Sequence, residues 1–200
     1  MRKSFTDAQD IFKQQNGILR TGQAKQLGID TKTIAEMYDA GLLHRLGRGL
    51  YRLAELPPLQ YPDFVQVALR VPRGVICLIS ALAFHNLTTK IPHKVYIALP
   101  QTVSRPQINY PPLDFIWLSP NVYKAGIEEH QLDGVSVSIY KKSKTVTDCF
   151  KFRNKVGKEV ALEALKEYVQ LPDADMNELL HFAQINRVAQ IMQPYLEIIL

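Results

Sequence analysis

The stretch "DTKTIAEMYDAGLLHRLGRGLYRL", residues 30–53, decides the fold of the N-terminal part of the chain. It opens on Asp30 or Thr31, either of which is a good N-cap, and Gly41 is placed to end the helix that follows. Alternating arms around Gly47-Arg48-Gly49 then predict a tight β-hairpin. A short helix and a basic hairpin therefore follow each other directly.

Two further short helices are expected before this stretch. "DAQDIFKQQ" (residues 7–15) has apolar residues at helical spacing, and "GQAKQLG" (residues 22–28) ends on a glycine. Three short helices followed by a hairpin have the order of a winged helix-turn-helix. The proline-rich segment "ELPPLQYPD" (residues 55–63) is the best linker. We therefore expect a winged-helix DNA-binding domain over residues 1–56.

The remaining residues, 57–200, predict a second domain of the α+β class. Its expected elements are a short helix at 64–71, a buried helix at 75–87, strands at 93–100 and 113–119, a hairpin at 126–140, and helices from residue 144 onward. This order indicates a small, mostly antiparallel sheet followed by a helical C-terminal tail. The chain as a whole is expected to be α+β.

Composition narrows the function only slightly. The chain has 200 residues and a formal charge of +5. This charge mildly favours an acidic partner such as nucleic acid. It has no apolar run long enough for a transmembrane helix, and its first residues are not those of a secretory signal. Cys77 and Cys149 lie far apart in apolar patterns, as buried reduced thiols do. We expect a cytoplasmic protein that does not bind a membrane.

Side chains in the N-terminal domain supply candidate DNA contacts. On the third helix, Ile34, Met37 and Tyr38 are expected to be buried. The first residues of a recognition helix usually meet the bases, and arginines on a wing reach phosphates or the minor groove. The candidates are Gln23, Lys25, Thr31, Lys32, Thr33, Arg45, Arg48 and Arg52. The alternative is that they are only capping and solvated surface residues.

The first 56 residues hold only three more basic than acidic side chains, from nine Lys/Arg and six Asp/Glu. A single winged helix with this charge would bind DNA weakly at physiological salt, so a homodimer on DNA would suit it. A second basic surface is expected between residues 141 and 158, for nucleic acid, for an acidic protein or simply for solvent. Its members are Lys141, Lys142, Lys144, Lys151, Arg153, Lys155 and Lys158.

The sequence fits no enzyme template. It has no glycine-rich phosphate loop and no closely spaced Cys/His ligand set, so we expect no catalytic residues, no metal and no cofactor. Ser80 and His85 do not align as nucleophile and base, and His85 is interpreted as a structural histidine. Five carboxylates could converge on a metal, but their spacing does not indicate it: Asp114, Glu128, Glu129, Asp133 and Asp148.

Four segments carry a family resemblance. The string from Gly17 to Glu55, together with "SALAFHNLT" and "TVTDCFKFRNKVGKEVALEALKEYV", resembles AbiEi-family antitoxins, as does the strand "KVYIALP". The resemblance spans about residues 12–169 and does not include the last 30 residues. No single motif is diagnostic, but their order together is specific.

The resemblance implies a bacterial transcriptional regulator of a type IV toxin–antitoxin system, linked to abortive infection and phage defence. Its N-terminal domain would bind inverted repeats in the double-stranded DNA of its own promoter and repress the operon. Its C-terminal domain would counteract a nucleotidyltransferase-like toxin without forming a stable complex. The matching positions make Thr31, Lys32 and Thr33 recognition-helix residues, and Arg45 and Arg48 wing residues.

Two other functions stay open. The winged helix and the basic helix would dock a protein partner in an adaptor, which would bind DNA poorly and an acidic protein well. A nuclease-like enzyme would instead use a carboxylate site that its spacing does not reveal, and would lose metal-dependent cleavage on acid-to-amide substitution.

Overall fold

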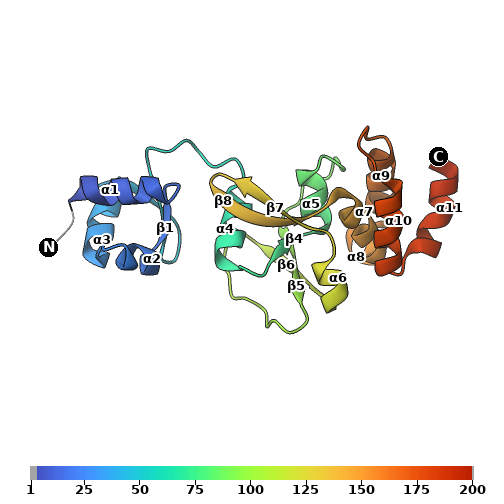
Figure 1. The fold of residues 1–200 in the computed structure, drawn as a ribbon, viewed down its shortest axis with the longest axis horizontal. Helices are drawn as coiled ribbons and strands as arrows, with labels where there is room; N and C mark the ends of the chain where they lie inside the picture. The colour runs from blue at the N-terminus through green and yellow to red at the C-terminus, as the bar shows by residue number, and fades with distance from the viewer. Residues whose placement is uncertain (1–3, 200) are drawn as a thin grey trace. The chain divides into compact units, whose positions relative to one another are not determined.

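The computed structural model describes residues 4–199, which fall into two compact units, one up to Pro62 and one from Asp63 (Figure 1). The expected boundary after residue 56 lies slightly before this division. No helix in the described part of the chain is long and apolar enough to span a membrane.

The N-terminal unit contains three helices and a three-stranded antiparallel sheet. Its elements are α1 (Phe5–Gln14), β1 (Ile18–Arg20), α2 (Thr21–Gln26), α3 (Thr31–Asp39), β2 (Leu43–Gly47) and β3 (Leu50–Leu53). Strand β3 lies between β1 and β2. The three expected helices and the hairpin are present, and the sequence did not indicate strand β1.

Apolar side chains from every element of this unit form one core. Phe12 of α1, Met37 of α3 and Leu53 of β3 are completely buried. A core of this size is small, so local caps contribute a sizeable share of the stability. Helix α1 has a capping box in which Ser4 and Asp7 each bond the other's backbone N–H.

The C-terminal unit contains a five-stranded sheet with helices on both faces (Figure 1). The strands are β4 (Val75–Ile76), β5 (Val95–Pro100), β6 (Leu113–Leu118), β7 (Ile127–Leu132) and β8 (Val135–Tyr140), in the order β6-β5-β4-β8-β7. The helices are α4 (Pro62–Arg70), α5 (Leu78–Phe84), α6 (Pro120–Lys124), α7 (Lys142–Lys151), α8 (Arg153–Val156), α9 (Lys158–Val169), α10 (Met176–Ile185) and α11 (Ala189–Ile199).

The α+β class and the C-terminal helices agree with expectation, but the sheet is mixed. Strand β4 pairs antiparallel with β5, and β7 pairs antiparallel with β8, whereas β5–β6 and β4–β8 are parallel. The long segment 101–112 lets the chain return before β6 begins, which a tight hairpin could not do. Residues 75–76, expected to start a helix, form strand β4 instead.

Alternating side chains divide the core of this unit into two layers. Ile97 of β5 and Ile139 of β8 face the layer that includes Val67 of α4, while Ala98 and Tyr140 face the helical layer. The helical layer is the larger and includes buried residues of α5, α7, α9, α10 and α11. From the strand order, β6 and β7 are the edge strands of the sheet.

Candidate nucleic-acid interface

Helix α3 presents a narrow polar face. Asp30 caps the helix, and its Oδ1 accepts a hydrogen bond of 2.6 Å from the Thr33 N–H. Thr33, Ile34 and Met37 point into the core of the unit. The opposite face is exposed at positions spaced by three and four residues, which are Thr31, Lys32, Ala35, Tyr38 and Asp39.

Two expectations about this helix are wrong. Thr33 was a candidate DNA contact but is only 1% exposed, because it lies one residue before Ile34 on the buried side. Tyr38 was expected in the core but is 46% exposed, and its ring lies edge-on to Tyr51 at 6.1 Å between ring centroids. Counting helical positions from the cap would have predicted that Tyr38 is exposed, since positions 31, 35 and 38 share one helical face.

The hairpin carries three further candidate contacts, of which two are exposed and one is buried. Arg45 and Arg48 are exposed, and Arg45 Nε donates to Gly47 O at 3.2 Å. Arg52 is 9% exposed, and its guanidinium donates to the carbonyl oxygens of Leu56 and Pro57. The proposed DNA contact through Arg52 is therefore wrong, because this side chain holds the segment that follows β3.

The hairpin is bonded to the start of α2. Thr21 N–H donates to Gly49 O at 2.9 Å, and the Thr21 hydroxyl donates to the same oxygen at 3.3 Å. Gly49 has a φ of +65°, a conformation that glycine adopts without strain. Gln23 and Lys25 of α2 are both exposed, and Gln23 Oε1 accepts from the Arg20 N–H at 3.0 Å, which caps the helix. The hydrogen bonds from Thr21 to Gly49 fix the tip of the hairpin beside the helix-turn-helix.

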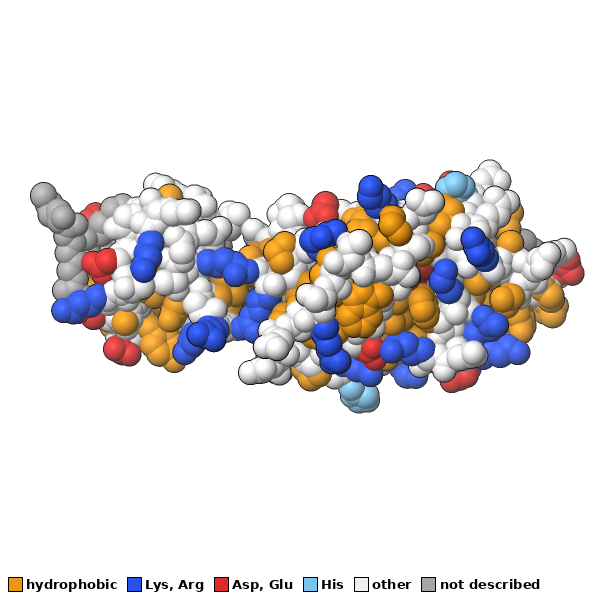
Figure 2. All heavy atoms as spheres, turned by 90° about the horizontal axis from the view of Figure 1, so that it is seen from below, with side chains coloured by type: hydrophobic (Ala, Val, Ile, Leu, Met, Phe, Trp, Pro, Cys, Tyr) orange, Lys and Arg blue, Asp and Glu red, His pale blue; other side chains and the backbone are white. Residues whose placement is uncertain are grey.

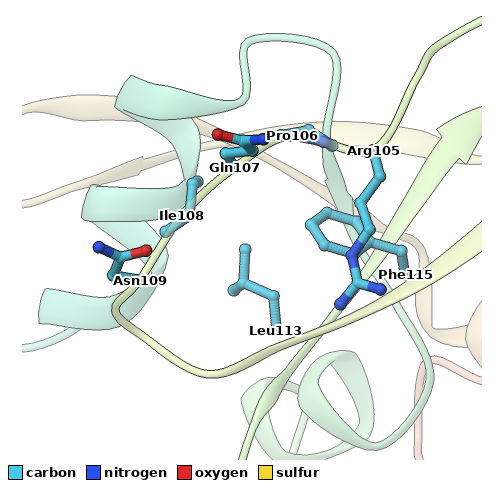
Figure 3. A pocket seen from close by; sticks show the side chains of 7 residues that line it. All are labelled: Arg105, Pro106, Gln107, Ile108, Asn109, Leu113 and Phe115. Atoms are coloured by element: carbon cyan, nitrogen blue, oxygen red, sulfur yellow. The ribbon is translucent and has the colours of Figure 1, made fainter.

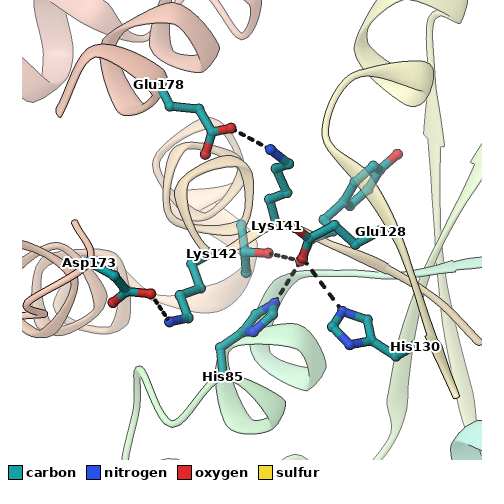
Figure 4. Close-up of polar contacts among 9 residues, drawn as sticks. His85, Glu128, His130, Lys141, Lys142, Asp173 and Glu178 are labelled. Carbon is teal, nitrogen blue, oxygen red and sulfur yellow. Dashed lines mark hydrogen bonds and ion pairs between the residues drawn. The ribbon is translucent and has the colours of Figure 1, made fainter. Parts of the chain in front are cut away.

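The expected second basic surface is largely neutralised. Lys141 pairs with Glu178 at 2.6 Å and Lys142 with Asp173 at 2.8 Å (Figure 4). Lys155 pairs with Asp114 at 2.7 Å. Four of the seven cations have a carboxylate partner once Lys144 is included, so their net positive charge is much lower than the sequence count.

Lys144 does not belong to any surface. It is completely buried on α7, its Nζ lies 2.5 Å from Asp148 Oδ1, and it stands 4.4 Å from the centroid of the Tyr140 ring. Asn186, the C-cap of α10, also donates to Asp148 Oδ1, at 2.8 Å. Placing Lys144 on a basic surface was wrong, because its partner one helical turn later allows the charge to be buried.

Two of the other three cations of this set have non-carboxylate contacts, and the third is half-buried. Lys158 Nζ lies 5.7 Å from the centroid of the Tyr195 ring, and Arg153 donates to Phe150 O at 2.9 Å. Burial lowers the pKa of Lys151 from its ordinary value. Lys151 and Arg153 are half-buried, whereas Lys158 is exposed.

The five carboxylates have separate surroundings. Asp114 binds Lys94 and Lys155, Glu129 accepts from the Ser136 and Ser138 hydroxyls, and Asp148 is in the buried pair. Glu128 lies 3.5 Å from His130 (Figure 4), and Asp133 is in the turn of the β7–β8 hairpin. Within residues 4–199, no group of three or more His, Cys, Asp or Glu side chains could hold a metal ion.

His85 and the two cysteines occupy structural positions. His85 Nε2 lies 2.7 Å from Tyr140 O, and burial lowers the pKa of its imidazole. Cys77 and Cys149 are free and buried, and burial raises the pKa of both thiols well above their ordinary value. A thiol with a raised pKa is a poor nucleophile.

One comparison with known proteins agrees with the resemblance seen in the sequence, over the N-terminal part of the chain. Residues 7–54 match the family described as the transcriptional regulator AbiEi antitoxin. The fold is similar to the crystal structure of RV2827C protein from Mycobacterium tuberculosis, with a TM-score of 0.62 and 11% sequence identity. The similarity covers 92% of this chain and 72% of that one. A search of curated proteins finds no match.

Proposed function

From the match of residues 7–54 to AbiEi antitoxin transcriptional regulators, we propose that the chain is a DNA-binding autorepressor and antitoxin of a type IV toxin–antitoxin system. The observation that carries the DNA-binding part is the pairing of an exposed polar face on α3 with a basic hairpin fixed beside the same helix-turn-helix. This is the arrangement by which a winged helix reads duplex DNA.

The proposal assigns distinct roles to the two halves of the interface. The exposed face of α3 lies in the major groove, where Thr31, Lys32 and Tyr38 meet base edges or phosphates. Arg45 and Arg48 of the hairpin lie along the backbone or in the minor groove. Lys25 of α2 adds a phosphate contact. Two protomers on inverted repeats of the chain's own promoter would double these contacts.

The C-terminal unit has the antitoxin role in this proposal. It opposes a nucleotidyltransferase-like toxin in the cytoplasm, without a stable toxin–antitoxin complex. Support for this part comes from the family resemblance.

A salt-titrated binding assay tests the DNA-binding part. The probe is a duplex from immediately upstream of the coding sequence, and the competitor is a scrambled duplex of the same composition. Four cations contact phosphates in the proposal, namely Lys25, Lys32, Arg45 and Arg48. At about −0.9 for each contact, the logarithm of affinity falls with the logarithm of salt with a slope of about −3.6 for one protomer and about −7 for a dimer.

Preferential binding to the upstream duplex supports repression at the chain's own promoter. Equal binding to both duplexes contradicts it. If neither duplex binds at low salt, the adaptor function is favoured, and the search turns to an acidic protein partner.

A further inference from the structure

Strand β6 and the segment before it form an exposed surface that the proposed DNA interface does not use. The β6 surface consists of Phe115 and Trp117 on β6, Lys94 before β5, and Arg105, Gln107 and Asn109 on the segment 101–112. These residues border two hollows that share Arg105 and Phe115: one of about 440 Å³, which Figure 3 shows, and one of about 260 Å³. Hollows of this size fall near the range of small-ligand sites, which is about 300–1,000 Å³.

Aromatic rings form the floor of the β6 surface. Phe115 and Trp117 are two residues apart and so lie on the same face of the edge strand, with 5.8 Å between their ring centroids. Phe115 is 9% exposed, so its ring lies at the base of the surface. The indole is 39% exposed, and its Nε1 donates to Val103 O at 2.9 Å, which holds the ring in place. A large aromatic ring that is both partly exposed and fixed is suited to stacking against a planar ligand.

Positive charge borders these rings. The Arg105 guanidinium lies 5.4 Å from the centroid of the Phe115 ring, and Figure 3 shows it beside that ring. Lys94 is bonded to Asp114 at 2.5 Å, but its side chain stays 44% exposed. Lys155 binds the other oxygen of Asp114 at 2.7 Å, so the three cations outnumber the single carboxylate. Figure 2 shows exposed hydrophobic side chains surrounded by Lys and Arg on one face of the C-terminal unit.

Amide side chains complete the set. Gln107 and Asn109 are exposed and border the larger hollow together with Arg105. An amide offers one acceptor and two donors, which match the hydrogen-bonding edge of an unpaired base.

We propose that the β6 surface binds unpaired nucleotides of a single-stranded nucleic acid. A base stacks on Trp117, a second base or its sugar lies against the Arg105–Phe115 pair, and Arg105 and Lys94 contact the phosphates. An acidic peptide would satisfy the cations but would leave the indole face and the amides without a specific partner. Duplex DNA does not fit, because its bases are already stacked on each other.

The chain offers a direct assay, because Trp117 is its only tryptophan. The full chain is titrated with single-stranded oligoadenylate, in an RNA arm and a DNA arm, while the indole emission is recorded. A duplex of equal length is the comparison. We expect saturable quenching by a single strand and not by the duplex. The two arms distinguish RNA from DNA as the source of the unpaired nucleotides.

Variants connect the signal to the surface. Arg105→Ala is expected to weaken binding about fivefold or more, and Trp117→Ala, followed through a labelled oligonucleotide, about 5- to 100-fold. The matched control is Lys166→Ala, which removes one exposed charge on α9 and should leave affinity unchanged apart from a small general effect. Circular dichroism checks that each variant is folded.

Three results would overturn the proposal. The first is no saturable change in Trp117 emission with either strand. The second is equal quenching by the duplex, which would indicate binding through general electrostatics. The third is an Arg105→Ala variant that binds as tightly as Lys166→Ala. Because the readout comes from Trp117, failure of the promoter-binding assay would leave this test unaffected.

Discussion

Replacing Lys144 by methionine tests the buried ion pair of the helical layer. Lys144 and Asp148 are one helical turn apart on α7, and both are almost completely inaccessible to solvent. Methionine preserves most of the volume but leaves the Asp148 carboxylate with the Asn186 amide and no cation. Removing one partner of a buried pair costs about 3–5 kcal/mol, because the other charge stays desolvated.

Urea denaturation measures this cost, and Trp117 reports on the C-terminal unit alone because it lies in β6. With a slope of about 2 kcal/mol per molar urea, the loss lowers the unfolding midpoint by about 2 M. The matched control Lys166→Met removes an exposed lysine and should shift the midpoint little. The double variant Lys144→Met/Asp148→Leu removes both charges and should recover most of the loss, because apolar replacements of such pairs are often neutral.

A loss below about 1 kcal/mol for Lys144→Met would refute the reasoning, because an uncompensated buried charge cannot be that inexpensive. A double variant no more stable than the single one would also refute it. It would show that packing, and not charge, determines the effect.

Three further predictions follow from the structure. Arg48→Ala should weaken binding to the upstream duplex and flatten the salt slope by about 0.9, as measured by salt titration. Arg52→Ala should leave this slope unchanged and lower the stability of the N-terminal unit by about 1–3 kcal/mol, as measured by thermal unfolding. Tyr38→Ala should reduce the preference for the upstream over the scrambled duplex, while Thr33→Ala should act on stability; equal preference in Tyr38→Ala and the unmodified chain would remove Tyr38 from the interface. Burial lowers the pKa of His85 from 6.5, so protonation below pH 6.5 favours the unfolded chain, and the stability of the C-terminal unit should decrease as the pH falls from 6.5. In His85→Gln this part of the pH dependence, measured by urea unfolding at several pH values, should be absent.

The sequence was sufficient for the three helices and the hairpin of the N-terminal unit, though not for strand β1, because their signals are local. An N-cap at Asp30, a stop at Gly41 and the glycines around Arg48 act within a few residues of each other. The orientation of single side chains was harder to predict. Thr33 and Tyr38 lie at the borders between the buried and exposed faces of α3, where an error of one position reverses the assignment.

Contacts that periodicity and residue type do not reveal account for the other differences. Tyr140 and Asp148 are both close to Lys144 in the sequence, but Asn186, which binds Asp148, comes from a distant part of the chain. No pattern around Arg52 shows that its guanidinium will bind carbonyls of the following segment. The parallel pairing of β5 with β6 depends on the path of residues 101–112, which carries no periodic signal. The DNA-contact residues themselves stay predictions until binding is measured.

The bond between Thr21 and Gly49 has a consequence for how such an interface evolves. The bond uses a backbone oxygen of the hairpin, so it does not depend on the identity of the side chain at the tip. Arg48 can therefore be exchanged for another residue while the hairpin keeps its place beside α2. A lineage could adapt to a diverging operator by changing this one exposed residue, without destabilising the scaffold that presents it.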